Sequence, residues 1–441
     1  METQDVAVTD QSVQDAIALL SGLPTGNSQE ACIERIQGRE QAKRILAAGQ
    51  AHDTHIVVEE RRAEEAAMRI PTSEQLKGAD AEIGLARGET AYMGASFTRT
   101  AIALHTVLPN TRAALASGRV SEFHARVVAE QTMHLSDVHR REIDAAIAHR
   151  LGKASTWQLR QLIEGHAYRL DRKAAEARAN DNKARRRVCM YPASDGQVYI
   201  TAELPTLQGL AVMDTLRKLT NKRRANHKAN AADDKPAGRD QIMADLFVEL
   251  ITGQTTADAV TGEVLVVIQD TALLGDDDLP AWIPGHGPLV ADIVKRWLAD
   301  PDAATFIRRL YTRPTDGQLV AMESTRRYFP ETLGKMLRIR DDICATPWCN
   351  NPAEDADHRQ PWAQGGATSW NNGNALCKGC NQRKENRGWS YTGSPDELTV
   401  TTPTGHSHTV PTRPPLAELK HWNSDPPPRL VIEGSNYRIA A

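Results

Sequence analysis

Four of the six cysteines lie close together in the last quarter of the chain. Four residues separate Cys344 from Cys349, and two residues separate Cys377 from Cys380. Two thiolate pairs of this kind can surround one Zn²⁺ tetrahedrally. Four unrelated buried cysteines are the alternative, but the rest of the chain contains only two more. A site closed by four thiolates has no open coordination position, so we expect this zinc to stabilise the fold and other residues to carry any catalysis.

The segment between and after the two pairs carries polar residues in a fixed order. Residues 357–359 read Asp-His-Arg, and residues 365–368 read Gly-Gly-Ala-Thr. Asn372 lies five residues before Cys377, and residues 381–384 read Asn-Gln-Arg-Lys. This order resembles the HNH endonucleases, whose pattern is an acidic residue or His before a catalytic His, a Gly-Gly-x-Thr loop, a central Asn and a closing Cys-His or Cys-Asn. Because an Asn holds the third position, the segment is similar to an H-N-N variant.

The resemblance implies a ββα-metal unit, in which two strands and a helix hold one divalent cation. His358 would be the general base, since an imidazole can accept a proton from water near neutral pH. Asp357 and Asn381 would bind Mg²⁺ or Mn²⁺ through oxygen atoms. Asn372 would fix the orientation of the general base. Three cations would contact phosphate and DNA: Lys384, Arg383 and Arg359. The implied function is a metal-dependent endonuclease that hydrolyses DNA phosphodiester bonds.

Each assignment has a structural alternative. An Asp-His pair on a strand can be structural or simply exposed, and Lys384 can be an ordinary exposed helix charge. Asn372 can serve as a turn residue, and its neighbours Asn371 and Asn374 compete for its role. For the whole protein, the alternative is a non-catalytic zinc-stabilised protein that binds DNA or acts as a scaffold.

Length and charge limit the other function classes. A chain of 441 residues exceeds one compact core, which excludes a single small module. Lys and Arg number 53 against 56 Asp and Glu, giving a net charge of −3. Whole-chain attraction to a polyanion is therefore not expected, and any DNA contact must come from local patches. Two basic stretches, residues 160–187 and 217–228, are candidates, although a solvated helix face and a disordered loop are equally good readings.

Membrane association is not expected from this sequence. No apolar stretch approaches the ~20 residues that a membrane helix needs. The first ten residues are acidic and lack the basic and apolar regions of a secretory signal. We therefore expect no membrane contact and a cytoplasmic location, where reduced cysteines favour metal binding over disulfides.

The elements that position these residues are mainly helical. Apolar residues at helical spacing predict one long helix over residues 28–70, and Ser155 with Gln158 forms a capping-box pattern at the start of another helix, 156–178. Alternating strands around Asp195-Gly196 predict a hairpin. We therefore predict a mainly helical α+β protein with a helical bundle, an α+β middle region and a C-terminal zinc-stabilised ββα-metal module. The predicted divisions are a flexible N-terminus 1–27, a helical domain 28–186, a middle region 187–334 with a flexible loop 221–238, a nuclease module 335–415 and a tail 416–441.

The helical part carries a second resemblance. Residues 108–111 read Leu-Pro-Asn-Thr, and residues 116–122 read Ala-Ser-Gly-Arg-Val-Ser-Glu. With the surrounding residues from 82 to 130, they resemble the helical domain of unknown function that precedes HNH modules in a large actinobacterial family. The resemblance implies nuclease chemistry, with DNA as partner and a further protein partner for the helical domain. It leaves the biological target and the oligomeric state open.

Overall fold

The computed structural model resolves the chain into two compact units. One unit contains residues 1–178 and 321–413, and the other contains residues 179–320 and 414–441. The residues that the structure describes are 15, 19, 28–193, 197–230, 237–256, 265–268, 272–273, 279–299, 323–324, 328–411, 429–433 and 436–440. Within these residues, no helix has the length and apolar character needed to cross a bilayer.

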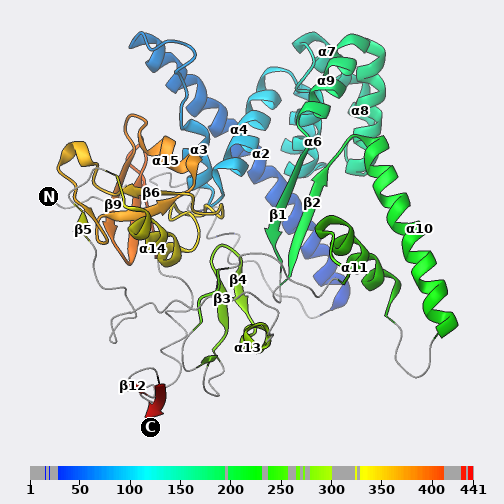
Figure 1. Ribbon diagram of the computed structural model, residues 1–441. Helices are drawn as coiled ribbons and strands as arrows, with labels where there is room; N and C mark the ends of the chain where they lie inside the picture. Colours follow the sequence, from blue (N-terminus) through cyan, green and yellow to red (C-terminus); the bar gives the residue numbers. More distant parts are fainter. Residues whose placement is uncertain are drawn as a thin grey trace. The chain divides into compact units, whose positions relative to one another are not determined.

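The first unit begins with a helical bundle (Figure 1). Its elements are α2 (Gln29–Ala67), α3 (Ala79–Ala86), α4 (Ala91–Thr106), α5 (Pro109–Ala116), α6 (Glu122–Thr132), α7 (Asp137–Ile147), the short 3₁₀ helix η1 (Ala148–Arg150), α8 (Thr156–Leu170) and α9 (Arg172–Ala184), which runs across the division between the units. Helix α4 lies at the centre of the bundle and packs against α2, α3, α5 and α6. Fully buried leucines and isoleucines, among them Leu104, Ile143 and Ile163, form the core of this bundle.

Local sequence signals set several of the helix ends. The capping box is confirmed, because the Gln158 backbone NH donates to the Ser155 hydroxyl at 3.3 Å and the Ser155 NH donates to the Gln158 side chain at 3.0 Å. The single helix predicted over 156–178 is wrong, since α8 ends at Leu170. Asp171 leaves the helical conformation and accepts a hydrogen bond from the Ala174 NH, and so begins α9.

A close approach of two helices fixes the position of α3. Gly94 of α4 lies against α3, and a Cβ atom at this position would come within 2.3 Å of the Asp80 carbonyl oxygen. Glycine is therefore required there, and its absence of a side chain lets α3 and α4 pack backbone to backbone.

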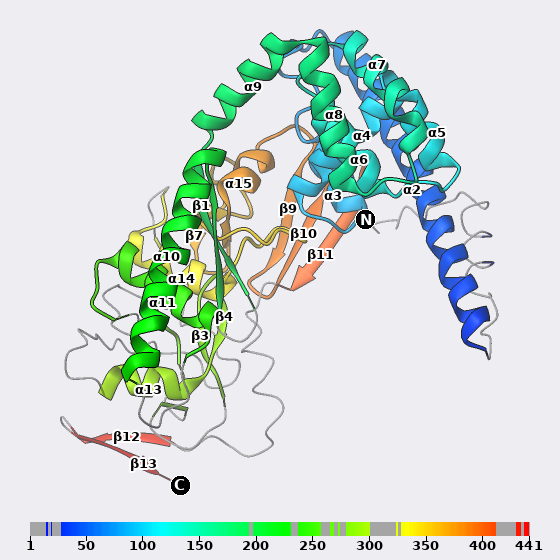
Figure 2. The same ribbon diagram turned by 90° about the vertical axis from the view of Figure 1, so that its right-hand side faces the viewer.

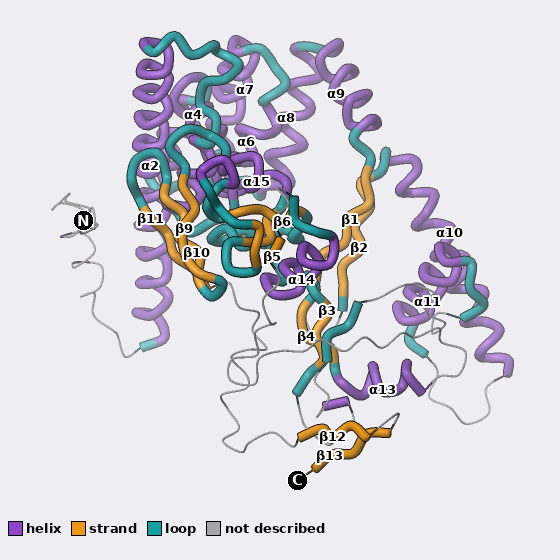
Figure 3. Tube along the Cα trace, turned by 60° about the vertical axis from the view of Figure 1, so that its left-hand side comes forward, coloured by secondary structure: helices purple, strands orange, loops and turns teal. Residues whose placement is uncertain are grey.

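The same unit contains the predicted nuclease segment, built from small sheets and two helices. Its elements are β5 (Glu323–Ser324), α14 (Glu331–Asp341), β6 (Asp355–His358), the 3₁₀ turn η2 (Trp362–Gln364), β7 (Thr368–Ser369), β8 (Gly373–Leu376), α15 (Lys378–Lys384), β9 (Ser390–Ser394), β10 (Glu397–Thr401) and β11 (Ser407–Pro411). Strands β6 and β8 pair antiparallel, as do β5 and β7. Strands β9, β10 and β11 form an antiparallel meander (Figure 3).

The second unit combines hairpins and helices (Figure 2). Its remaining elements are β1 (Arg187–Pro192), β2 (Val198–Glu203), α10 (Thr206–Asn230), α11 (Arg239–Thr252), β3 (Ala281–Ile283), β4 (Gly287–Leu289), α13 (Ala291–Ala299), β12 (Arg429–Glu433) and β13 (Asn436–Ala440). The antiparallel β1–β2 hairpin is confirmed, although its predicted turn at Asp195-Gly196 lies outside the described residues. The mainly helical α+β fold class is also confirmed.

Two segments contain regular structure that the sequence analysis did not predict. Residues 221–230 were expected in a flexible loop, but α10 continues through them. This stretch is rich in Lys, Arg and Ala, which are strong helix formers, and Arg223 pairs with Glu249 of α11 at 2.8 Å. In the C-terminal tail, β12 and β13 pair as an antiparallel hairpin. In both segments, a lack of regularly spaced apolar residues did not indicate the helix and the hairpin that form there.

Candidate metal centre and nuclease site

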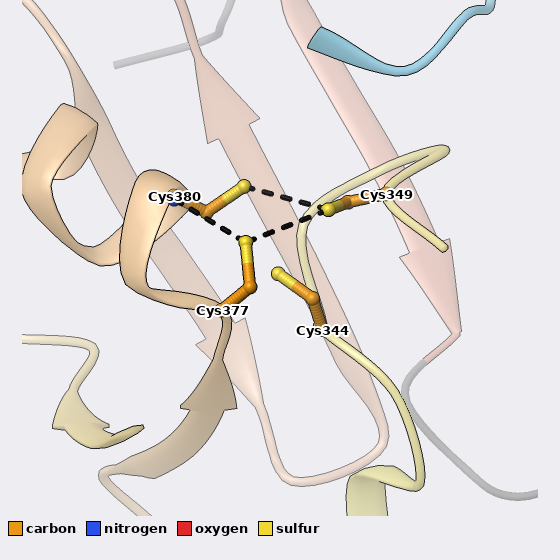
Figure 4. A group of neighbouring side chains, drawn as sticks. All are labelled: Cys344, Cys349, Cys377 and Cys380. Atoms are coloured by element: carbon orange, nitrogen blue, oxygen red, sulfur yellow. Dashed lines mark hydrogen bonds between the residues drawn. The ribbon is translucent and has the colours of Figure 1, made fainter. Parts of the chain in front are cut away.

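Four sulfur atoms converge at the start of α15 (Figure 4). The sulfur of Cys349 lies 3.8 Å from that of Cys377 and 3.6 Å from that of Cys380, and the ligand atoms of all four cysteines, including Cys344, lie within 4.8 Å of one another. Tetrahedral zinc with Zn–S bonds of about 2.3 Å places its sulfur ligands about 3.8 Å apart. The cluster therefore fits the structural zinc site predicted from the cysteine spacing.

The thiols of this cluster share protons. Hydrogen bonds from Cys344, Cys349 and Cys380 hold the pKa of Cys377 well below its usual range, whereas hydrogen bonding to the other thiols, that of Cys349 first, raises the pKa of Cys344. Cys377 is also the N-cap residue of α15, and its sulfur accepts the Cys380 backbone NH at 3.5 Å. A zinc ion would replace the shared protons and bind all four sulfurs as thiolates.

Helix α3 of the bundle covers one side of the cysteine cluster. Ala81 and Leu85 belong to the same buried cluster as the four cysteines and Trp389. At the start of α3, Gly78 has a φ of 87°, and a Cβ there would lie 2.8 Å from the Trp389 indole nitrogen. Helix α3 of the bundle therefore contributes side chains to the apolar core around the cysteine cluster.

A buried carboxylate joins the two parts as well. Glu82 of α3 is 7 % exposed, pairs with Arg61 of α2 at 2.6 Å and accepts the Thr404 backbone NH at 3.0 Å and the Thr404 hydroxyl. Burial alone raises the pKa of Glu82, but hydrogen bonds from Thr404, Thr402 and Arg61 outweigh it and hold the pKa below its ordinary value of 4.5. Glu82 is therefore a charged link between the bundle and the turn before β11.

The two predicted ligands of the catalytic cation, Asp357 of β6 and Asn381 of α15, lie where these two elements pack together. The Asn381 side-chain amide donates to Asp355 at 3.1 Å, and the Lys384 ammonium pairs with Asp357. Because residues 355 and 357 point to the same side of a strand and residues 381 and 384 lie one turn apart on a helix, the four form two adjacent rungs. Asp357 and Asn381 are diagonal neighbours in this arrangement and do not contact each other through a hydrogen bond.

The predicted general base lies on the other side of β6. His358 is 8 % exposed, and its Nε2 lies 2.8 Å from the Thr368 hydroxyl of β7. The rings of Phe329 and Trp362 lie against it, with centroids 4.5 and 6.1 Å away. Successive side chains of a strand point to opposite faces, which separates His358 from the carboxylate of Asp357.

Asn372 holds the loop that follows β6. Its amide oxygen accepts the Gln360 NH at 2.9 Å, and its amide nitrogen donates to the carbonyl oxygens of Gln360 and Ala367 at 3.0 and 2.9 Å. Its own carbonyl accepts the Arg359 NH at 2.7 Å. Asn372 thus fixes the backbone directly after His358.

The three predicted phosphate contacts differ in their surroundings. Lys384 is buried, and besides its pair with Asp357 its ammonium donates to the His358 carbonyl. Arg359 is buried as well: it donates to the Asn371 carbonyl at 2.8 Å, its Nε and Nη2 have no partner within the described residues, and burial together with the nearby Arg340 charge lowers its pKa to about 10. Arg383 is half-exposed and donates to the Cys380 sulfur at 3.5 Å. Only Arg383 therefore stands at the surface.

The sequence analysis missed Asp355 and gave Asn374 only a competing role. Asp355 bonds to Asn381, and its position two residues before Asp357 was the available signal. Asn374 is the register partner of Asp357 in the β6–β8 pair, so both side chains share one face. It is fully buried, and neither amide atom has a hydrogen-bond partner in the described part of the chain.

Two family models match the chain. The model described as HNH endonuclease matches residues 344–387, and the model described as a domain of unknown function, DUF222, matches residues 36–341. The chain belongs to the DUF222 family. The predicted combination of an HNH segment with an N-terminal domain of unknown function is thereby confirmed, and the HNH match supports a nuclease-type function. Comparisons with curated proteins and with solved structures found no match.

The boundary between the DUF222 and HNH matches lies inside one packed unit. Arg340, at the end of the DUF222 match, donates to the carbonyl oxygens of Trp370 and Gly373 at 2.9 Å each. Asp341 bonds to Arg340 and accepts the Ala375 NH at 2.7 Å. The end of α14 therefore supplies hydrogen-bond partners to β8, a strand of the HNH segment.

The cysteine cluster predicts a tightly bound metal. We expect about one Zn²⁺ per chain, and we expect Cys377→Ser to lose it and to unfold the HNH segment, because structural zinc contributes on the order of 10 kcal/mol to the folding of small modules. Elemental analysis and near-ultraviolet circular dichroism measure the two effects. Cys32→Ser, outside the cluster, is the control and should retain the ion. A wild-type protein purified without chelators and free of zinc would contradict the assignment.

Glu82 predicts a pH-dependent link between α3 and the strands. At pH 7, Glu82→Gln should lower the free energy of unfolding by about 1–3 kcal/mol, because it weakens buried hydrogen bonds to a charged group. Since the folded pKa of Glu82 is lowered, this contribution is complete above pH 4.5 and is lost as the pH falls further through the folded pKa.

Urea unfolding of wild type and variant at pH 7 and below pH 4.5 measures that difference. Glu74→Gln removes an exposed pair with Lys77 and should change stability by less than about 0.5 kcal/mol at either pH. A Glu82→Gln effect that is equally small at pH 7, or that grows on acidification, argues against the link.

Proposed function

We propose that this protein is a metal-dependent endonuclease that hydrolyses phosphodiester bonds in DNA, with His358 as general base. The observation that carries the proposal is the ββα arrangement itself. Strands β6 and β8 and helix α15 place Asp355, Asp357 and Asn381 together, and His358 ends the same strand. DNA is the substrate that the HNH match suggests.

The donor atoms fit a hard divalent cation. Asp355, Asp357 and Asn381 offer carboxylate and amide oxygens, which suit Mg²⁺ or Mn²⁺ and not a soft ion. The unpartnered amide of Asn374 on the same face supports the fit, because a buried polar group without a partner costs about 1–3 kcal/mol unless water or an ion satisfies it. When bound, the ion would stabilise negative charge on the phosphate and the leaving oxygen.

The chain's own residues orient the base and the substrate. The Thr368 hydroxyl and the rings of Phe329 and Trp362 restrict rotation of His358, which would accept the proton of the attacking water. Asn372 holds the loop after this histidine. Arg383, half-exposed on α15, would contact phosphate, as would the Nε and Nη2 atoms of Arg359, which have no partner among the described residues.

One observation favours the alternative that the protein is not catalytic. The Lys384 ammonium pairs with the Asp357 carboxylate, to which a divalent cation would have to bind. If Lys384 neutralises Asp357 permanently, the module is a zinc-stabilised scaffold or DNA-binding unit without chemistry. If a cation displaces it, Lys384 is released toward the phosphate, as the sequence suggests. Cleavage in the presence of Mg²⁺ or Mn²⁺ and titration of the metal distinguish a permanent ion pair from one that a cation displaces.

We extend the proposal to location and partners. The six cysteines form no disulfide in the described residues, and a thiolate site suits a reducing compartment such as the cytoplasm. The helical bundle would position the DNA or a protein partner.

His358 predicts the activity test. On supercoiled plasmid with Mg²⁺ or Mn²⁺, His358→Ala should nick about 10²–10⁴-fold more slowly than wild type, because it removes the general base. His149→Ala, an exposed histidine of η1, should nick at the wild-type rate. Equal nicking by wild type and His358→Ala, or no cleavage with any metal, refutes the proposal. Zinc content measured in parallel shows that the variant is folded.

Asp357 predicts a change in metal dependence. Asp357→Asn should raise the Mg²⁺ or Mn²⁺ concentration for half-maximal cleavage by more than about tenfold, because it removes a charged ligand. Glu354→Gln, at an exposed neighbouring position, is the matched control and should leave the metal titration unchanged. A permanent Lys384–Asp357 pair predicts instead that neither substitution changes metal binding, which isothermal titration of the zinc-loaded protein can detect.

A further inference from the structure

Helix α10 has a packed face and a charged face. Leu216 and Thr220 are buried, and Leu216 forms a small core with Ile242 and Leu246 of α11. One turn later, Arg223 makes a two-pronged ion pair with Glu249 of α11, at 3.1 and 2.8 Å. Residues at this spacing share one side of a helix, so that side is committed to α11 (Figure 2).

The solvent-exposed surface of α10 between residues 217 and 224 is basic. Arg217, Lys218, Lys222 and Arg224 are exposed. Lys218 is paired with Asp214 at 2.6 Å, whereas the other three have no hydrogen bond or ion pair within the described residues. Residues 215–230 contain no Asp or Glu. At about 100° per residue, Arg217 and Arg224 fall almost in line, and Lys218 and Lys222 form a second line about 130° further around the helix.

We propose that this basic face of α10, defined by Arg217, Lys218, Lys222 and Arg224, binds the phosphate backbone of duplex DNA without reading its sequence. Arg217 and Arg224 lie about 10 Å apart along the helix, so they can contact separate phosphates of one duplex. The net charge of the chain is −3, so these cations are a local concentration and not a share of a generally basic surface.

The composition of the helix favours duplex DNA over single strands. Proteins hold single-stranded nucleic acid largely by stacking its bases on aromatic rings. No Phe, Tyr or Trp occurs anywhere in α10. A row of cations without aromatic residues can bind phosphates but cannot stack bases. The inference rests on the proposed function only in taking DNA as the partner, and it assigns a surface that none of the predicted nuclease residues belongs to.

The test is the salt dependence of binding by the full-length, zinc-loaded protein. Its probe is a fluorescein-labelled random-sequence duplex of 25 base pairs, measured by anisotropy without Mg²⁺ or Mn²⁺ so that no cleavage occurs. The variant Arg217→Gln/Lys222→Gln/Arg224→Gln should bind at least about tenfold more weakly near 100 mM KCl, and its slope of log Kd against log[KCl] should fall by about 2.7, for three lost phosphate contacts.

Two matched variants control for net charge and for folding. Arg39→Gln/Arg99→Gln/Lys153→Gln removes three exposed cations of the first unit, from α2, α4 and the turn before α8, and should keep the wild-type slope. Arg217→Lys/Arg224→Lys keeps the charges of the basic face and should also keep the wild-type slope of log Kd against log[KCl]. Equal losses in the α10 triple variant and in the scattered triple variant would mean that only net charge matters, and would overturn the proposal.

The remaining outcomes are also decisive. If the α10 triple variant loses binding to single-stranded RNA or polyglutamate and keeps its affinity for the duplex, the face has a different partner and the proposal is wrong. Plasmid cleavage by the wild type is followed separately. Duplex binding that depends on the basic face, in a protein that never cleaves, would refute the nuclease function and leave this inference standing.

Discussion

Convergence of four sulfur atoms determines the geometry of the predicted nuclease segment. Cys377 is at once a sulfur of the cluster and the N-cap of α15, so the cluster fixes both the start and the direction of this helix. From that start, Asn381 and Lys384 follow on the side that meets β6, opposite Asp355 and Asp357. The cysteine cluster therefore sets the register in which Asn381 and Lys384 meet Asp355 and Asp357.

The same convergence makes the two family matches interdependent. Leu85 of α3 packs in the core that contains the cysteines, and Glu82 bonds to Thr404 beyond the HNH match. Arg340 and Asp341 are a buried pair, which is stable only when further hydrogen bonds satisfy both charges. Those bonds come from the Trp370 carbonyl and from the backbone of β8. The strand thus stabilises the end of α14, and α14 stabilises the strand, so the limits of the family matches are not limits of folding.

Sequence reasoning succeeded where the signal was local. Cysteine spacing predicted the metal cluster, and the Ser155 and Gln158 pair predicted a helix start. It failed where distant segments decide the outcome. Nothing near Lys384 in the sequence indicates that its ammonium is buried against Asp357, because that contact joins residues 27 positions apart. Likewise, the contact between Glu82 and Thr404 spans 322 positions and leaves no periodic pattern.

The charges of the β6–α15 face bear on how the proposed nuclease function would engage DNA. Asp355 and Asp357 together with Lys384 give the β6–α15 face a net charge of −1 in the absence of a divalent ion, and this charge repels phosphate. A bound divalent cation would reverse the sign to +1, so substrate affinity at the site depends on the metal. Arg383 adds one half-exposed charge, and Arg359 is buried. If the protein cleaves DNA as proposed, cations elsewhere in the chain would hold the substrate before the ion binds, and Arg217, Lys222 and Arg224 of α10 are exposed without acidic partners among the described residues.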